Sequence, residues 1–192
     1  MHRFSSLLAA CIALGVAACA SSPPTLVALP SPALRSDRAA LDAATTVRLR
    51  HVRLPEYLDG FPVMVGRDRQ ALVIADRAEW AERPSQGVTR VLRDALAQRL
   101  GSTNVLIAGD GRRADAELAV EFMALDPEPD GLHLDARWSF VCRASGSSHA
   151  GRTSTSVATA APTPQAVAAA TSEALSRLAD AIVDELRCAG RG

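Results

Sequence analysis

Alternating apolar and polar positions predict several strands in the first half of the chain. The clearest alternation runs through 46–54, where arginines separate the apolar residues. Its phase changes near His51, as it does at a β-bulge. Two short apolar runs, 63–65 and 71–74, flank the polar sequence GRDRQ and predict a hairpin. The run 25–30 predicts an earlier short strand.

The second half of the chain predicts further strands. A short apolar strand is expected at 104–109. The segments 116–126 and 132–142 each alternate with period two and are separated by the turn sequence PEPDG, so they predict an antiparallel pair. A turn is expected at 144–151, and the polar segment 151–160 predicts a last strand at an edge of the sheet.

Two stretches have the periodicity of amphipathic helices. The first follows Pro84, with Ser85 as the expected N-cap and Gly101 as the expected C-cap. The second spans 164–188, and its alanines allow close approach to a sheet. A helical turn is also expected at 37–43. The predicted fold is a single α/β (α+β) domain with a mostly antiparallel β-sheet packed by two main amphipathic helices.

The amino terminus is typical of an exported lipoprotein. Arg3 precedes about 12 uncharged residues, which as a helix would span only about 18 Å of the roughly 30 Å of bilayer hydrocarbon, so the sequence predicts a signal peptide at 1–18. The following VAAC resembles a bacterial lipobox, which predicts diacylglycerol on Cys19 and a lipidated tether at 19–24. An ordinary secretory signal with Cys19 as a plain thiol is the alternative.

The rest of the chain, 25–188, is long enough for one domain with its own core. It contains two cysteines, Cys142 and Cys188. In an oxidising compartment two thiols favour a disulfide, and the predicted strand and helix allow one. Two separate buried thiols are the alternative.

Charge and motif content exclude several function classes. Acidic and basic residues balance at 21 each, and the arginines are dispersed among acidic residues, so nucleic acid is not an expected partner. His51, His133 and His149 lie far apart in the sequence, without metal-ligand spacing. No nucleophile elbow, phosphate-binding loop or dinucleotide-binding motif occurs. We expect no catalysis, no metal and no cofactor.

The block 52–101 resembles the central signature of the PqiC-like ABC-type transport auxiliary lipoproteins. In that family a strand ending in VRLPEYLD precedes a hairpin, a tryptophan-alanine-glutamate turn and a helix that ends in leucine-glycine. The matching residues here are Leu54, Pro55, Tyr57, Leu58, Asp59, Trp80, Ala81, Glu82, Val91, Leu92, Leu100 and Gly101. The resemblance covers roughly 25–186, but 31–44 matches nothing in the family, and 25–27 lacks the tyrosines common there.

The resemblance implies an auxiliary subunit that works with an MCE-domain protein and its inner-membrane partner in lipid transport between membranes. Such a subunit binds rather than catalyses. Ala20 follows the lipidated cysteine, at the position where an aspartate would favour retention in the inner membrane. We therefore expect the protein to be located at the periplasmic face of the outer membrane, anchored by its acyl chains.

The candidate docking residues are Leu54, Pro55, Tyr57 and Phe61, in the sequence LPEYLDGF. Packing of these residues against the core is the alternative. Two other functions stay open: a carrier that binds lipid in a groove between sheet and helix, and a structural envelope lipoprotein without a transport role. A phospholipid and a further copy of the chain also stay open as partners.

Overall fold

The structure, a computed structural model, describes residues 22–34, 45–69, 71–106, 109–186 and 188. The expected signal peptide at 1–18, the lipidation site Cys19 and the helical turn at 37–43 lie outside the described residues.

Five strands form the larger sheet, in the order β5-β2-β6-β7-β8. They are β2 (Val47–Arg53), β5 (Val105–Leu106), β6 (Ala116–Glu128), β7 (Gly131–Cys142) and β8 (Ser148–Ala158). The predicted antiparallel pairing of β6 with β7 is confirmed, and β8 forms an edge as predicted. Strand β2 runs parallel to both β5 and β6. This parallel course was not predicted from the sequence, because alternation of apolar and polar residues carries no information about strand direction.

The predicted irregularity in β2 is confirmed, since its register against β6 shifts between Leu49 and His51. A second shift, between Phe122 and Ala124 of β6, was not predicted. The expected turn at 144–151 was wrong in extent, because β8 begins at Ser148 and pairs with β7 from there on. An edge strand can carry polar side chains without burying them, so its polar start looked like a turn.

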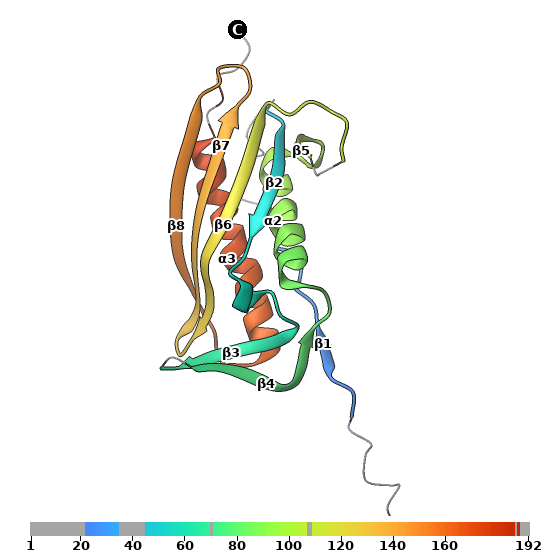
Figure 1. Cartoon of the computed structure of the whole chain (residues 1–192), viewed down its shortest axis with the longest axis vertical. Helices are drawn as coiled ribbons and strands as arrows, with labels where there is room; N and C mark the ends of the chain where they lie inside the picture. Colours follow the sequence, from blue (N-terminus) through green and yellow to red (C-terminus); the bar gives the residue numbers. More distant parts are fainter. Residues whose placement is uncertain (1–21, 35–44, 70, 107–108, 187, 189–192) are drawn as a thin grey trace, which may run out of the picture.

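A smaller sheet of three strands, in the order β1-β4-β3, lies at one end of the molecule (Figure 1). Strand β3 (Pro62–Asp68) is antiparallel to the first half of β4 (Ala71–Trp80), as the predicted hairpin requires. The second half of β4 pairs in parallel with β1 (Thr25–Val27), so β4 is longer than the predicted run. Between the two halves Arg77 has a φ of 48°, where β4 bends sharply (Figure 1).

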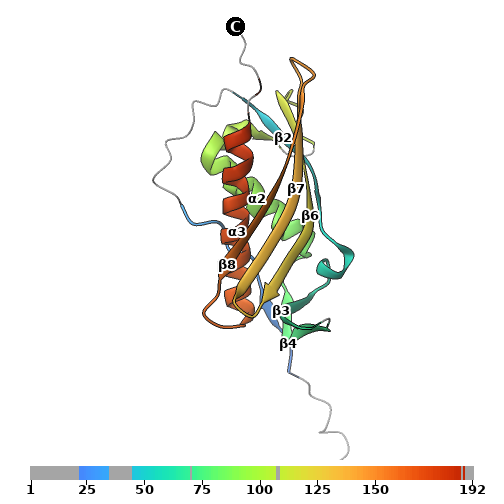
Figure 2. The same cartoon turned by 90° about the vertical axis from the view of Figure 1, so that its left-hand side faces the viewer.

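The two predicted helices, α2 (Pro84–Leu100) and α3 (Pro164–Glu185), are confirmed and lie on one side of β6, β7 and β8 (Figure 2). The expected N-cap at Ser85 was wrong, because the N-cap is Arg83, two residues earlier, and α2 starts at Pro84. Pro84 fits the first helical position, where no N–H is needed. Gly101 ends α2 with a φ of 88°, as predicted for a C-cap.

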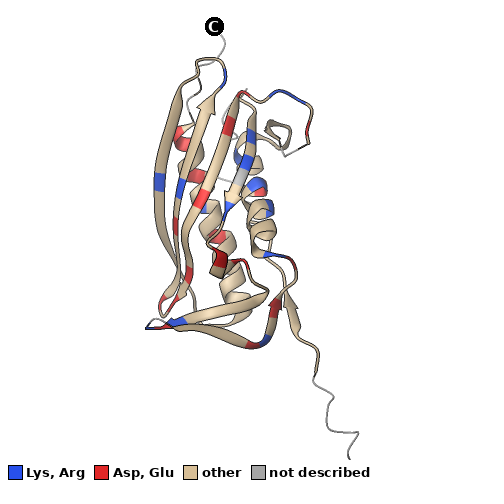
Figure 3. Ribbon diagram, in the orientation of Figure 1, with Lys and Arg blue, Asp and Glu red and all other residues tan. Residues whose placement is uncertain are grey.

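The core lies between the two helices and the covered face of the larger sheet. Charged residues are dispersed over strands and helices rather than gathered in one region (Figure 3). The largest fully buried side chains are Phe122, Phe140, Leu92, Leu96, Leu106, Leu118, Leu132, Leu134, Leu175, Leu178, Ile182 and Val47.

A buried ion pair joins α2 to α3. Arg99 is 5% exposed, and its Nε and Nη2 each donate a 2.9 Å hydrogen bond to a carboxylate oxygen of Asp180. Nη2 also donates to the carbonyl and hydroxyl oxygens of Ser176, and Nη1 donates to the Ala95 carbonyl. These extra acceptors offset the cost of burying the guanidinium group.

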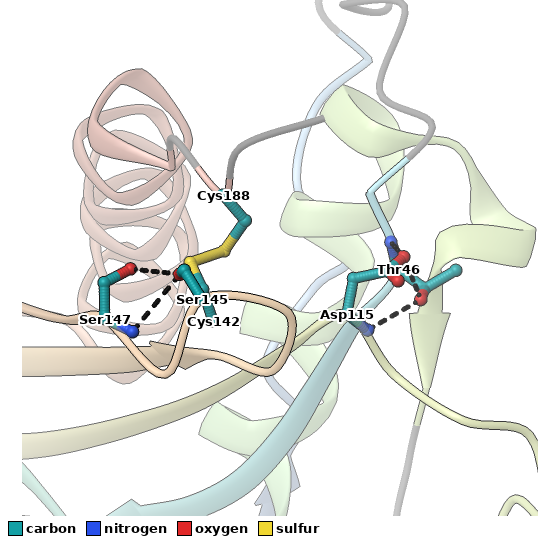
Figure 4. Close-up of a disulfide and its surroundings, with 6 residues drawn as sticks. All are labelled: Thr46, Asp115, Cys142, Ser145, Ser147 and Cys188. Atoms are coloured by element: carbon teal, nitrogen blue, oxygen red, sulfur yellow. Dashed lines mark hydrogen bonds between the residues drawn. A yellow bond between two sulfur atoms is a disulfide. The ribbon is translucent and has the colours of Figure 1, made fainter. Parts of the chain in front are cut away.

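A disulfide joins Cys142, the last residue of β7, to Cys188, which follows α3 (Figure 4). The two Cα atoms lie 5.4 Å apart, within the usual range. Of the two alternatives that the sequence allowed, the structure has the bonded pair. Next to it, Thr46 and Asp115 exchange hydrogen bonds just before β2 and β6, which aligns the starts of these parallel strands (Figure 4).

Replacing Arg99 should destabilise the domain strongly. We expect Arg99→Ala to lower the free energy of unfolding by about 3 kcal/mol, because it leaves the Asp180 carboxylate between the helices without its cation. The matched control is Arg177→Ala, since Arg177 pairs with Glu173 at the surface of α3, where such a pair contributes about 0.5 kcal/mol. Urea unfolding followed by circular dichroism measures both. Equal losses would contradict the role given to Arg99.

The disulfide can be tested chemically. Alkylation of the unfolded, unreduced protein should leave Cys142 and Cys188 unmodified in a peptide mass spectrum, and reduction should expose both. The bond closes a sequence separation of 46 residues, so the double variant Cys142→Ala/Cys188→Ala should lose about 4 kcal/mol of unfolding free energy. Alkylation of both cysteines without reductant would show two free thiols instead.

Candidate functional site

The segment 54–61, with the sequence LPEYLDGF, connects β2 to β3 and contains the predicted docking residues. After Pro55 the chain makes a single 3-10 turn, η1 (Glu56–Leu58). Leu58 is buried and Leu54 packs against the core, whereas Tyr57 and Phe61 are each 44% exposed. The structure therefore divides the segment into two inward leucines and two aromatic rings at the surface.

Tyr57 is held by a polar contact at its tip. Its hydroxyl group donates a 2.9 Å hydrogen bond to Oδ1 of Asp126 on β6, and Nη2 of Arg67 on β3 donates to the other carboxylate oxygen at 2.8 Å. Partial burial and the Asp126 carboxylate raise the pKa of Tyr57 above its ordinary value, so the phenol remains a donor at neutral pH. The contact fixes η1 against both sheets.

Phe61 is held by its backbone and by a cation. Its carbonyl accepts a 2.7 Å hydrogen bond from the backbone N–H of Trp80. The guanidinium carbon of Arg83 lies 5.6 Å from the ring centroid, at cation–π distance. Nearby, Oδ1 of Asp59 accepts the backbone N–H of Ser85 in the first turn of α2, where a carboxylate is favourable. These contacts fix the segment to the start of α2.

The uncovered face of the larger sheet carries a shallow groove of about 590 Å³. Three small residues at paired positions cross its floor: Ala119 on β6, Ser139 on β7 and Ala150 on β8. Side chains at paired positions on one face are neighbours, so three small ones in line leave a depression between the larger rows beside them.

The next row of paired positions forms a charged wall of this groove. It consists of Arg53, Glu121, Arg137 and Arg152, on β2, β6, β7 and β8 respectively. In Figure 3 the row crosses the sheet as segments that are blue on β8, blue on β7, red on β6 and blue on β2. Arg152 is paired with Asp135, so the guanidinium groups of Arg53 and Arg137 against the Glu121 carboxylate leave a small excess of positive charge, which favours an anionic partner. Because Arg53 directly precedes Leu54, the groove adjoins the segment 54–61.

One arginine of the wall has a fixed partner. Nε and Nη2 of Arg152 donate hydrogen bonds of 2.8 and 2.6 Å to the two carboxylate oxygens of Asp135 on β7. These hydrogen bonds hold the pKa of Asp135 below its ordinary value. Arg152 is thereby kept in place at the edge of the groove.

A small, partly open apolar cavity lies where the two sheets and the two helices meet, lined by residues that include Leu29, Leu54, Met64, Trp80 and Val167. Its volume is about 40 Å³. Sites for small molecules usually measure roughly 300 to 1,000 Å³. A lipid chain does not fit this cavity as it stands.

Two histidines lie on neighbouring strands. The His149 ring of β8 stacks on Phe140 with centroids 4.9 Å apart, and Nδ1 of His133 on β7 lies 3.4 Å from the Ser156 hydroxyl. Within the described ranges, no group of three or more histidine, cysteine or acidic residues is arranged to hold a metal ion. Over the same part of the chain, we find no helix with the length and apolar character needed to cross a membrane.

Comparison with known families decides the class of the protein. The model of the ABC-type transport auxiliary lipoprotein component matches residues 28–183. The chain belongs to this family. The resemblance noted in the block 52–101 is therefore confirmed, and the ABC-type transport auxiliary lipoproteins are transporter components rather than a class of enzyme.

Two of the solved structures that match share the fold of this auxiliary lipoprotein. A crystal structure of an uncharacterised protein matches with a TM-score of 0.69 at 16% identity, covering 86% of this chain and 100% of the other. Protein XCC0632 from Xanthomonas campestris has a TM-score of 0.62 at 12% identity, covering 85% and 93%. The PelC dodecamer from Paraburkholderia phytofirmans has a TM-score of 0.45 at 11% identity, covering 79% and 94%. No curated protein matches the chain.

The groove of the auxiliary lipoprotein was not predicted from the sequence. Its signal was present, because small residues stand on the polar faces of all three antiparallel strands. Only the register between strands shows that Ala119, Ser139 and Ala150 are in line, and that arginines occupy the adjoining row.

The Asp135–Arg152 pair should make the stability of the lipoprotein depend on pH. Because the folded-state pKa of Asp135 is lowered, the pair contributes stability above the ordinary pKa of about 3.9 and loses it as the pH falls through the lower folded value. We therefore expect Arg152→Ala to lower the Tm at pH 7 and to converge with the unaltered protein towards pH 2. Thermal unfolding between pH 2 and 7 measures this difference. A difference in Tm that is constant over this range would contradict the pairing.

Proposed function

We propose that this protein is the lipid-anchored periplasmic auxiliary subunit of an MCE/ABC-type intermembrane lipid transport system, which it serves by binding an MCE-domain protein and anchoring it at the outer membrane. One observation carries the proposal: a member of a transport auxiliary family displays two aromatic rings, Tyr57 and Phe61, on a segment fixed to the domain on both sides.

Rigid aromatic side chains suit a docking role. Tyrosine and phenylalanine supply a large contact area with few rotatable bonds, so little entropy is lost when a partner covers them. Tyr57 already has its hydroxyl hydrogen-bonded to Asp126, and Phe61 lies against Arg83, so neither ring needs to be ordered on binding. Such rings, with arginine beside them, are the usual centres of binding energy at interfaces.

The adjoining groove gives the proposed docking surface a charged continuation. With Arg152 paired to Asp135, Arg53 and Arg137 still outnumber the single carboxylate of Glu121 in it. The partner surface that fits best has an apolar patch for the two rings and acidic residues facing the groove.

Anchoring makes weak contacts sufficient. Acyl chains on Cys19 would confine the domain to the membrane surface, and a short tether raises the effective concentration of the docking surface for a partner that reaches the same membrane. The sequence has no phosphate-binding loop, so the energy for transport would come from the inner-membrane partner.

The carrier function receives less support. Its pocket would be the apolar cavity beside Leu54 and Trp80, which at about 40 Å³ holds no acyl chain. A structural envelope lipoprotein differs from the proposed subunit in having no MCE-domain partner.

Photocrosslinking in cells tests the docking surface. A photoreactive residue in place of Phe61 should crosslink to an MCE-domain protein, identified by mass spectrometry. The matched control is Val141, which is similarly exposed but lies on β7 beside the disulfide. Crosslinks from position 141 with none from position 61 would refute the docking surface. Crosslinks from position 61 to lipid, without any to a protein, would favour the alternative function of a lipid-binding carrier.

Substitution measures the strength of the same contact. Phe61→Asp should reduce copurification of the MCE-domain protein at least tenfold, because loss of a central aromatic contact costs about 2 kcal/mol or more. Val141→Asp should leave copurification unchanged. Equal effects of the two substitutions would place the interface elsewhere.

A further inference from the structure

Apolar side chains are exposed together at one end of the molecule. Leu72, Val73 and Ile74 are consecutive in β4, with Ile74 56% exposed, and Leu26 in neighbouring β1 is 64% exposed. Successive side chains of a strand point to opposite faces, so the β3–β4 hairpin exposes apolar residues on both of its faces. A cluster of this kind on a protein surface usually marks a contact with a membrane or another protein.

The hairpin lies at the end of the molecule where the described chain begins. In Figures 1 and 2, β3 and β4 cross the end next to β1, while the carboxyl end of α3 lies at the opposite end. The bend at Arg77 separates the part of β4 that pairs with β1 from the part that carries Leu72 and Ile74. This bend directs the apolar half across the end of the domain.

The length of chain before β1 restricts the distance to the membrane. From Cys19 to Thr25 a fully extended chain reaches about 20 Å at most. Leu26 then pairs with Glu79 of β4, only five residues from Ile74. Acyl chains on Cys19 would therefore hold this end of the domain, and not the end with the disulfide, at the bilayer surface.

An exposed apolar strand can be covered by a strand of another protein chain or by a bilayer, and the two cover different parts of it. A second strand could pair with 71–76 of β4 on the side away from β3, where the pairing with β1 does not reach, and it would leave much of both faces exposed. A bilayer interface surrounds the hairpin and covers both faces at once. Asp68 with Arg69 and Asp76 with Arg77 stand on either side of the run and balance in charge, so apolar burial rather than attraction to anionic lipid would drive the contact.

We propose that the β3–β4 hairpin is a second membrane contact, which inserts Leu72, Val73 and Ile74, with Leu26 beside them, into the interface of the bilayer that holds the acyl chains. The inference rests on lipidation of Cys19, which is part of the proposed function. With two contacts at one end, the long axis of the domain stands up from the bilayer, and the strands of the larger sheet run away from it.

Fluorescence quenching in vesicles tests the hairpin directly. The acylated mature protein lacks 1–18 and with it Cys11, so it has no free thiol when Cys19 is lipidated and Cys142 is bonded to Cys188. Ile74→Cys then takes a single environment-sensitive NBD label. The protein is reconstituted in vesicles of phosphatidylethanolamine and phosphatidylglycerol at 3:1. Doxyl-labelled lipid should quench this label at least threefold more than a label at Val141→Cys, and aqueous iodide should quench it at least threefold less. Vesicles of phosphatidylcholine should give the same result.

The outcomes against the proposal are distinct. Equal iodide quenching at both positions would overturn it, and so would rapid disulfide crosslinking between two copies through position 74, which would indicate a second copy as the occupant. An intact mass that lacks diacylglycerol would show that Cys19 is not lipidated, and this result would also overturn the proposal. A Val73→Cys label repeats the test, with circular dichroism as the check of folding. These vesicles contain no partner protein, so failure of docking through Phe61 leaves the result unchanged.

Discussion

The covering of one face of the larger sheet by α2 and α3 is the constraint on which the rest of the structure depends. The Arg99–Asp180 pair joins the two helices into one layer, and that layer buries the apolar side of β6 and β7. The opposite side then has to consist of residues that tolerate water. Its small and charged residues fall in separate rows, and the groove results from this separation.

Among the exposed apolar residues that the helices do not cover, two groups matter for the proposed function and the proposed membrane contact. One is the pair of rings on the segment 54–61, fixed between Asp126 and the start of α2. The other is the hairpin run around Val73, turned outwards by the bend at Arg77. In the proposed account the first group meets a partner protein and the second meets the bilayer, so membrane anchoring and docking use different surfaces of one rigid domain.

The sequence predicted the elements well but not their arrangement. Period-two alternation identified β6 and β7, and the phase change near His51 located the bulge, because both depend only on which side chains are buried. The parallel direction of β2 and the buried ion pair of Arg99 with Asp180 depend on contacts between segments that are distant in the sequence, and periodicity does not encode such contacts. In the same way Tyr57 and Phe61 could be named from the sequence as candidate docking residues. The groove could not be predicted, because it depends on the register between β6, β7 and β8.

Hydrogen–deuterium exchange of the acylated protein in vesicles, with and without the MCE-domain partner, tests the division of surfaces most directly. The account predicts that vesicles alone protect 71–76 relative to detergent, and that the partner adds protection at 54–61 and at 137–139 of β7, which line the groove. Protection of 54–61 by vesicles alone, or partner protection confined to the turn near Ser145 beside the disulfide, would contradict it.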